Sequence, residues 1–253
     1  MTELERQGAQ ARAAARVLAM ASTAQKNQAL EAIAIALETC QDDVLAANAA
    51  DMAAARAAGM RPAMLDRLLL DEGRIRGVAA GVRQVMALED PVGRMVEMTT
   101  RPNGLQIGKK TVPLGVIGMI YEARPNVTVD AAVLCLKAGN AVILRGGKEA
   151  FATNNALTAL MRGAIARAGL PEDAISLVQD TSRASATELM GLRGYLDVLI
   201  PRGGAGLIRS VVENARVPVI ETGAGVCHVY VERSADLDMA ARIIENAKCS
   251  RPS

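Results

Sequence analysis

Apolar residues recur at helical spacing through the first part of the chain. Ser22 and Gln25 form a candidate capping box at the start of one such helix. Four apolar residues fall on one face of that helix: Leu30, Ile33, Ala34 and Leu37. The same spacing continues beyond Gly59 and Pro62, which separate two further helical segments. Residues 1–90 are therefore predicted to be helical.

The pattern changes near Asp90, where β-branched runs lie on both sides of a Pro-Asn-Gly turn at 102–104. It predicts a β-hairpin excursion within 91–113 and then a buried strand from Leu114 to Ile120. Short apolar runs alternate with helical segments in the remaining part, 114–253. The further predicted strands are AVILR, AISLV, LDVLI and VPVI, and the helices between them end at Lys137, span about 150–168, cover 185–190 and follow Gly206.

Continuous apolar strands separated by helices are typical of a parallel sheet that is covered on both faces. The predicted fold is therefore α/β: N-terminal helices, a hairpin, and a Rossmann-like, mostly parallel sheet with helices on both faces. Ligands of such folds bind at the carboxyl ends of the strands, near the point where the strand order reverses.

Composition narrows the classes of function that the chain could have. A hydrophobic content of 51% with 22% charged residues is typical of a folded globular protein. The net charge of +2 and the aromatic content of 2% give no reason to expect nucleic acid. No apolar stretch approaches a membrane span, and the N-terminus lacks the pattern of a signal peptide, which predicts the cytoplasm. Four irregularly spaced cysteines and one histidine predict neither disulfides nor a metal site.

Two Gly-Gly turns, each with a cation beside it, directly follow predicted strands. They consist of Arg145, Gly146, Gly147 and Lys148, and of Pro201, Arg202, Gly203 and Gly204. Glycine allows the backbone to approach a ligand closely, while the cations and a following helix N-terminus attract a phosphate. One such turn is weak evidence, but two of them favour an anionic nucleotide. Neither turn is a GxGxxG or a GxxxxGK[ST] motif.

Other candidates have structural as well as functional interpretations. Arg124 and Asn126 could bind an anion and polarise a carbonyl oxygen, but they are equally ordinary helix-entry residues. Glu221, at a predicted strand end with Thr222 and Gly223, could be a general base or a solvated carboxylate.

The histidine and three of the cysteines favour structural roles. His228 lies in an alternating, strand-like segment, where a structural role is favoured. Cys40, Cys135 and Cys227 lie in apolar surroundings that predict small core residues.

Four stretches then carry a resemblance: PLGVIGMIYEARPNVTVDAAVLCLKAGNAVILRGGKEA, DVLIPRGG, VPVIETGAGVCHVYV, and NAK followed by RP. In order and spacing they resemble the γ-glutamyl phosphate reductase (glutamate-5-semialdehyde dehydrogenase) family, a branch of the aldehyde dehydrogenase superfamily. The similarity runs from the first helices to Ser253.

The resemblance implies NADPH-dependent reduction of L-glutamyl 5-phosphate to glutamate 5-semialdehyde, with release of phosphate, in proline biosynthesis. In that family a cysteine thiolate attacks the acyl phosphate and the resulting thioester is reduced by hydride from the nicotinamide. The resemblance also implies a small-molecule acyl phosphate substrate, glutamate 5-kinase as a candidate partner, and a homo-oligomer in the full-length enzyme. Residues 1–253 would then be a cofactor-binding domain whose segment 91–113 is of an oligomerisation type.

Site residues follow from the same resemblance. Arg145 and Lys148 match the loop that faces the adenosine ribose and its 2′-phosphate, and the turn from Pro201 to Gly204 matches the one near the pyrophosphate. Asn126 lies near the oxyanion asparagine of the superfamily. Glu221 lies in the segment that holds the general base of hydrolytic relatives.

The catalytic cysteine of the family follows the NAK and RP motifs, which places it just after Ser253 in this sequence. Cys249 is several residues too early, a displacement much larger than an attack geometry tolerates. The catalytic domain is therefore expected outside this chain, with apolar surface exposed near the strand ends and self-association as a consequence.

Three hypotheses remain. The chain is the cofactor-binding part of such an enzyme and is inactive by itself; or it is a non-catalytic nucleotide-binding or interaction module; or Cys249 has become the nucleophile.

Overall fold

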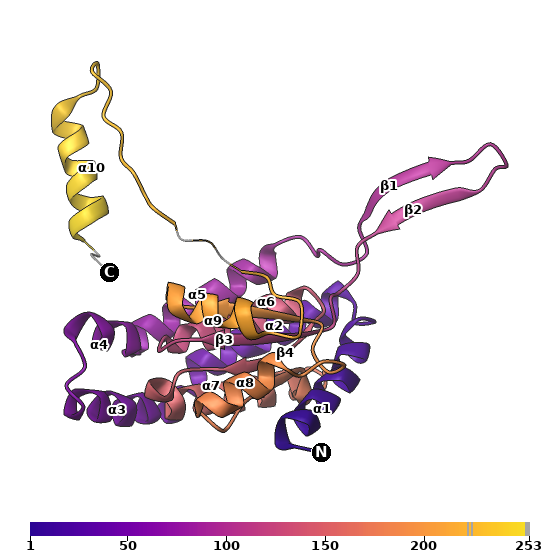
Figure 1. Ribbon diagram of the computed structural model, residues 1–253, viewed down its shortest axis with the longest axis horizontal. Coiled ribbons are helices and arrows are strands. Elements are labelled where there is room, and N and C mark those ends of the chain that lie inside the picture. The colour runs from indigo at the N-terminus through magenta and orange to yellow at the C-terminus, as the bar shows by residue number, and fades with distance from the viewer. Residues whose placement is uncertain (222, 224, 251–253) are drawn as a thin grey trace. The chain divides into compact units, whose positions relative to one another are not determined.

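The computed structural model describes residues 1–221, 223 and 225–250. The chain forms two compact units, Met1–Thr222 and Gly223–Ser253. The first unit contains the N-terminal helices, the hairpin and the parallel sheet (Figure 1). The predicted α/β fold is confirmed.

Five helices come first: α1 (Glu3–Leu18), α2 (Thr23–Thr39), α3 (Asp42–Ala57), α4 (Pro62–Leu68) and α5 (Glu72–Ala87). The predicted capping box opens α2, since Ser22 Oγ accepts from the Gln25 N–H at 3.2 Å and Gln25 Oε1 accepts from the Ser22 N–H at 3.0 Å. All four residues of the predicted apolar face are buried. The side chain of Asp71 accepts from the Arg74 N–H at 2.7 Å and so caps the N-terminus of α5.

The predicted hairpin consists of β1 (Met95–Thr100) and β2 (Gln106–Lys110), paired antiparallel. Gly104 supplies the turn with a φ of +86°, a conformation that favours glycine. Every residue of both strands is exposed, and the hairpin extends away from the helices of its unit (Figure 1).

The buried strand after the hairpin starts two residues later than predicted. Leu114 is exposed, and β3 covers Val116–Tyr121. Gly115 has a φ of +121°, which lies outside the conformation of a β-strand. The strand therefore begins only after that glycine.

The sheet has four parallel strands in the order β5-β4-β3-β6. The other three are β4 (Ala141–Arg145), β5 (Ile175–Leu177) and β6 (Val198–Arg202). The connecting helices are α6 (Pro125–Lys137), α7 (Phe151–Arg167) and α8 (Arg183–Met190), with α9 (Ala205–Asn214) after the last strand and short 3₁₀ turns η1 (Lys148–Ala150) and η2 (Glu172–Ala174). Helices α6 and α7 connect β3 to β4 and β4 to β5, so the chain moves toward one edge of the sheet. Helix α8 then carries it back across the sheet to β6 at the other edge. Because crossovers are right-handed, this reversal places α8 on the opposite face. The strand order therefore reverses between β3 and β6.

Two further strand predictions for the sheet differ from the structure. The strand predicted as LDVLI is shifted, so that Pro201 and Arg202 belong to β6 rather than to the turn. Proline is tolerated there because β6 is an edge strand. The segment VPVI is not a strand, since it forms a single bridge between Leu199 and Val219. Pro218 accepts from the Leu199 N–H at 2.8 Å but has no N–H of its own with which to extend the pairing.

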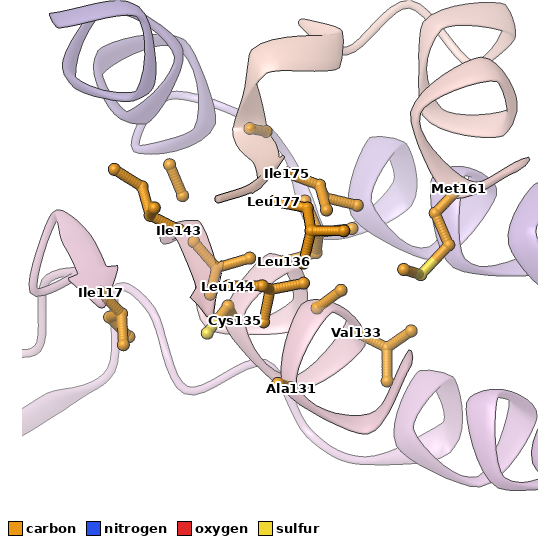
Figure 2. Close-up of a cluster of buried hydrophobic side chains, with 14 of the residues drawn as sticks. Ile117, Ala131, Val133, Cys135, Leu136, Ile143, Leu144, Met161, Ile175 and Leu177 are labelled. Carbon is orange, nitrogen blue, oxygen red and sulfur yellow. The ribbon is translucent and has the colours of Figure 1, made fainter. Parts of the chain in front are cut away.

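Aliphatic side chains fill the space between the sheet and the helices. Leu136 of α6 and Met161 of α7 are buried together with Ile143 and Leu144 of β4 and Ile175 of β5 (Figure 2). Burial of each such side chain stabilises the fold by about 2 kcal/mol. This core fixes the strands whose carboxyl ends form the candidate site.

The second unit contains α10 (Leu237–Cys249), whose N-terminus is capped where Asp236 accepts from the Met239 N–H at 3.0 Å. Lys248 Nζ donates to the Cys227 carbonyl at 2.7 Å. The prediction of a strand around His228 is wrong, because the described residues between 223 and 236 contain no strand. Alternating side chains do not form a strand unless a neighbour pairs with the backbone.

The prediction that three cysteines are core residues holds for one of them. Cys135 is buried in α6, and burial raises the pKa of its thiol to about 12. Cys40 is exposed because it follows the last turn of α2 as its C-cap. Cys227 is exposed within its own unit.

A buried ion pair fixes the point where the helical part meets the hairpin. Lys26 is 1% exposed, and its Nζ lies 2.6 Å from Oδ2 of Asp90. Thr23 Oγ1 also donates to Asp90 at 2.6 Å, and the Val92 N–H donates at 2.9 Å. Burial by itself would raise the pKa of Asp90, but the bonds from Lys26, Thr23 and Val92 and the charge of Lys26 hold it below its ordinary value.

We predict that Asp90→Asn lowers the free energy of unfolding by about 3 kcal/mol, because it leaves Lys26 buried without a counter-charge. Urea denaturation at neutral pH measures the change. Glu97→Gln is the matched control, since its partner Lys109 is 77% exposed and the loss should stay within about 1 kcal/mol.

The pH dependence has a defined sign. A depressed carboxyl pKa contributes stability at neutral pH, and this contribution is lost as the pH falls below about 4, the ordinary aspartate value. The difference between wild type and Asp90→Asn should therefore shrink in acid. An equal difference at all pH values would contradict the role of the pair.

Candidate cofactor and anion site

Two cavities adjoin at the carboxyl ends of the parallel strands. The larger, about 900 Å³, lies where β3 and β4 end and includes the loop after β5. The smaller, about 380 Å³, lies at the ends of β3 and β6, where the strand order reverses. Both are lined by Met64, Tyr121, Glu122 and Ala123, so they share a wall. This is the position in which a parallel α/β sheet binds its ligands.

Arg145 lines the larger cavity but also fixes one of its walls. Its guanidinium donates to the carbonyls of Thr181 at 2.6 Å and Ser182 at 2.8 Å. Burial lowers the pKa of Arg145, while the charges of Asp180 and Glu149 oppose that change. Arg145, which the sequence predicted to contact a phosphate, therefore holds the loop between β5 and α8. Its buried Nε atom has no partner among the described residues.

Hydrogen bonds within the loop that Arg145 holds also stabilise it. Asp180 accepts from both the backbone N–H and the hydroxyl of Ser182 at 2.7 Å, and these bonds lower its pKa. Ser182 in turn caps α8 by accepting from the Ser185 N–H. The backbone before α8 is thus fixed, and the next residue, Arg183, lines the cavity.

The first Gly-Gly turn packs tightly against the end of β3. A Cβ atom on Gly146 would lie 2.4 Å from Nδ2 of Asn154, and one on Gly147 would lie 2.7 Å from Glu149 and 3.4 Å from the Ala123 nitrogen. Side chains at these positions would displace the turn or fill the cavity.

Two cations remain free around the larger cavity. Lys148 and Arg183 both line it, and their side chains have no hydrogen-bond or ion-pair partner among the described residues. Cations without an internal partner are available for an anionic ligand. The cavity therefore offers two positive charges without an internal partner in addition to the fixed charge of Arg145.

The second Gly-Gly turn already holds an anion that belongs to the protein. The Gly204 N–H, at the N-cap of α9, donates to Oε1 of Glu122 at 2.9 Å. A Cβ atom on Gly203 would lie 2.7 Å from the same carboxylate. The carboxylate thus occupies the positive end of α9, and glycine makes room for it. Arg202 lines the smaller cavity, whereas Pro201 is buried within β6.

Asn126 lies in the first turn of α6, directly after Pro125. Its Nδ2 donates to Asp130 at 3.3 Å, and both residues line the smaller cavity together with Arg124. Burial raises the pKa of Asp130, against the opposing effects of the Asn126 bond and the Arg202 charge. Asn126 is thus both a helix-entry residue and a cavity residue, and its oxyanion role stays a prediction.

Several predicted residues are not brought to these cavities. Glu221 is exposed and contributes to neither lining, and Gly223 belongs to the second unit. Thr222 and the position expected for the nucleophile, after Ser253, lie outside the described residues. Cys249 is exposed at the end of α10.

Several cavity residues were not predicted from the sequence, and three of them carry charges that bear on the site. Glu122 follows β3, Arg183 starts α8, and Arg67 enters from α4, far away along the chain. Glu122 could have been found from its place at a strand end. Nothing in the helical spacing around Arg67 distinguishes it from a solvated arginine.

No described helix has the length and hydropathy needed to cross a bilayer. Among residues 1–221, 223 and 225–250, no group of three or more His, Cys, Asp or Glu side chains could hold a metal ion.

The structural comparisons support one fold. The crystal structure of a γ-glutamyl phosphate reductase from Thermotoga maritima superimposes with a TM-score of 0.92 at 42% identity, over 99% of this chain and 61% of that one. The enzyme of the same name from Saccharomyces cerevisiae gives a TM-score of 0.79 at 30% identity, over 99% and 64%. An acetylating aldehyde dehydrogenase from Geobacillus thermoglucosidasius, at 21% identity and a TM-score of 0.71 over 97% and 51%, shares the fold.

No family model matches the chain. Individual relatives do: γ-glutamyl phosphate reductase from Moorella thermoacetica is 63% identical over 250 residues, which cover 99% of this chain and 60% of that protein. The enzyme of the same name from Carboxydothermus hydrogenoformans is 59% identical over 253 residues, or 100% and 61%. The predicted resemblance is therefore confirmed: over its whole length the chain is homologous to γ-glutamyl phosphate reductase, and it spans about three fifths of those enzymes.

Proposed function

We propose that this chain is the cofactor-binding part of an enzyme that reduces L-glutamyl 5-phosphate to L-glutamate 5-semialdehyde with NADPH and releases phosphate, a step of proline biosynthesis. The identity to relatives of that name supports the reaction. The observation that carries the cofactor assignment is the larger cavity, which joins a Gly-Gly turn, a fixed loop and two free cations at the strand ends.

The residues around this cavity fit a phosphorylated dinucleotide. Lys148 and Arg183 would bind the 2′-phosphate, because each is a cation without an internal partner. Arg145 would act as a positioning residue that holds the loop on which Arg183 lies. Gly147 leaves open the space that a Cβ atom would fill.

When bound, the nicotinamide supplies a hydride to the acyl carbon. The rest of the reaction belongs to the protein: attack by a thiolate forms a carbon–sulfur bond and breaks the bond between the acyl carbon and the phosphate oxygen, so that phosphate leaves with the bonding electrons. Arrival of the hydride would then break the carbon–sulfur bond and return the thiolate. We place that thiolate beyond Ser253, in the part of the enzyme that this chain does not include. The role of Asn126 as an oxyanion donor belongs to this proposal.

The same proposal covers location and assembly. We expect the enzyme to act in the cytoplasm on a small acyl phosphate, with glutamate 5-kinase as a candidate partner that would supply this labile substrate. The hairpin would join neighbouring subunits in a homo-oligomer, because Met95, Val96, Met98 and Ile107 are exposed apolar residues on it.

We predict that Lys148→Ala and Arg183→Ala each weaken NADP⁺ binding by about tenfold, since each removes a charge-assisted contact with the 2′-phosphate. Binding of NAD⁺, which lacks that phosphate, should change far less. Isothermal titration of the chain with both nucleotides measures the difference.

The matched control for that experiment is Arg56→Ala, an exposed arginine on α3 that lines neither cavity. An equal loss of NAD⁺ and NADP⁺ binding in the two cavity variants would contradict the 2′-phosphate assignment. Failure of the wild-type chain to bind either nucleotide would contradict the cofactor assignment itself.

We further predict that the chain by itself gives no turnover with glutamate 5-semialdehyde, phosphate and NADP⁺, the oxidative direction of the reaction. The measurement is NADPH absorbance, with a full-length relative as positive control. Turnover that Cys249→Ser abolishes would instead make Cys249 the nucleophile. Nucleotide binding without turnover, in a natural sequence that encodes no catalytic domain after residue 253, would favour a binding module.

A further inference from the structure

A third cavity lies beside β5, the edge strand of the sheet opposite to β6. Its volume is about 350 Å³, at the lower end of the range for small-molecule sites. Helix α1, helix α7 and the segment 173–179 line it, and among the described residues it shares none with the two cavities at the strand ends. Apart from Ala159 and Leu177, every lining residue is polar or charged. A cavity of this composition suits a small polar ligand.

Three polar side chains of this cavity, one on each wall, lack hydrogen-bond partners. Thr158 of α7 is 5% exposed, and its Oγ1 atom is buried without a partner among the described residues, as is the Oε1 atom of Gln7 on α1. Ser176 of β5 is 6% exposed, and its hydroxyl also has no partner in the described part of the chain. Buried polar groups are normally paired, because an unpaired one costs free energy. A ligand with matching groups would satisfy all three walls.

The two helices present complementary chemistry to the cavity. On α1, Glu3 and Gln7 are four residues apart and therefore share a helix face, where a carboxylate and an amide oxygen are both acceptors. On α7, Thr158 and Arg162 have the same spacing, and a hydroxyl and a guanidinium are both donors. One wall is thus suited to a positive group of a ligand, and the facing helix to a negative group.

The charges around the cavity cancel. Its charged residues are two cations and two anions, and they form the pairs Arg6–Glu3 and Arg162–Asp173, the second at 3.0 Å. Sites for a phosphate or a metal ion need an excess of one sign, so the balance disfavours both ligands. Arg162 also donates to the Ile175 carbonyl at 2.7 Å, but a guanidinium has five N–H donors and some stay available. A neutral cavity with both signs favours a ligand that carries both signs.

We infer that this cavity is a binding site for a small zwitterion of the amino-acid class, with its ammonium toward α1 and its carboxylate toward α7. The ammonium would donate to Gln7 Oε1, and the carboxylate would accept from the hydroxyls of Thr158 and Ser176. Bonds to charged groups are stronger than those between neutral groups, so a zwitterion gains more from these atoms than a neutral polyol does. Because the cavity is separate from the nucleotide site, the inference does not rest on the proposed function.

The test is calorimetric titration of the chain with glycine, L-serine and L-proline, and with glycine betaine. Glycine betaine matches L-proline in size and in both charges, but it has no N–H to donate to Gln7 Oε1. At least one amino acid should bind, and glycine betaine should bind about tenfold or more weakly than L-proline. Glycerol and inorganic phosphate are the neutral and the anionic comparison, and neither should displace the amino acid.

Two variants on different walls test the contacts. Thr158→Val and Gln7→Met should each weaken amino-acid binding by about tenfold, since each removes a hydrogen bond to a charged group. Thr158→Val keeps the shape of the side chain and removes a buried hydroxyl without a partner, so the melting temperature of the ligand-free chain should not fall. Thr39→Val, at an exposed threonine on α2 outside the cavity, is the matched control and should leave binding unchanged.

Circular dichroism and thermal melting establish that each variant is folded, and Thr158→Val keeps the test decisive should Gln7→Met disturb α1. A wild-type chain that binds none of the amino acids, so that water is the only occupant, overturns the inference. Unchanged binding in both folded variants, or equal binding of glycine betaine or glycerol, overturns it as well. Failure of NADP⁺ to bind would refute the cofactor assignment alone and leave this site standing.

Discussion

The parallel pairing of β3 with β6 is the constraint on which the candidate site depends. Its register places Tyr121 opposite Arg202, while the pairing with β4 places Ile120 opposite Arg145. Three strand ends that are far apart in the sequence therefore terminate at one edge of the sheet. Connections leave that edge toward opposite faces, which opens the space between them. The smaller cavity would not exist if β6 paired at the other side of the sheet, beside β5, because its lining combines the ends of β3 and β6.

A buried polar network, in addition to the apolar core, keeps this edge in place. The hydroxyls of Tyr121 and Thr128 are hydrogen-bonded at 2.6 Å, and Thr128 donates to Asn154 at 2.8 Å. Burial raises the pKa of Tyr121, so its hydroxyl stays protonated and keeps its donor. The chain of bonds joins β3, α6 and α7 directly behind Gly146, whose missing Cβ leaves room for it. A buried network of connected hydrogen bonds holds its members in one arrangement, which suits the support of a binding site.

Prediction from the sequence worked where local rules decide the structure. The capping box at Ser22, the turn at Gly104 and the alternation of strands and helices each depend on residues close together in the chain. It was less successful where proline or glycine limits pairing, as at Gly115 and Pro218. In the second unit, alternating polarity around His228 predicted a strand that the described residues do not form.

The candidate site was predictable only in part, because the roles of its residues depend on partners that are far away in the sequence. Strand-end residues such as Arg145 and Lys148 could be assigned to the ligand edge from the pattern, because parallel strands present their carboxyl ends together. Their individual roles could not, because a role depends on partners that the pattern does not contain. The loop carbonyls of Thr181 and Ser182 make Arg145 a support, and they lie far along the chain from it. Arg67 reaches the same edge from a helix that precedes the sheet altogether.

Glu122 shows why internal partners decide what an anion site can bind. Its carboxylate accepts the Gly204 N–H at the N-cap of α9 and lines the smaller cavity together with its arginines. A ligand phosphate that used the same N–H would have to displace a carboxylate that is tethered to β3 and therefore present at a high effective concentration. A phosphate bound by the arginines would leave that contact intact. The geometry of one carboxylate thus decides which donors at this strand end a ligand can use: the Gly204 N–H is occupied, and the guanidinium groups of the smaller cavity are not.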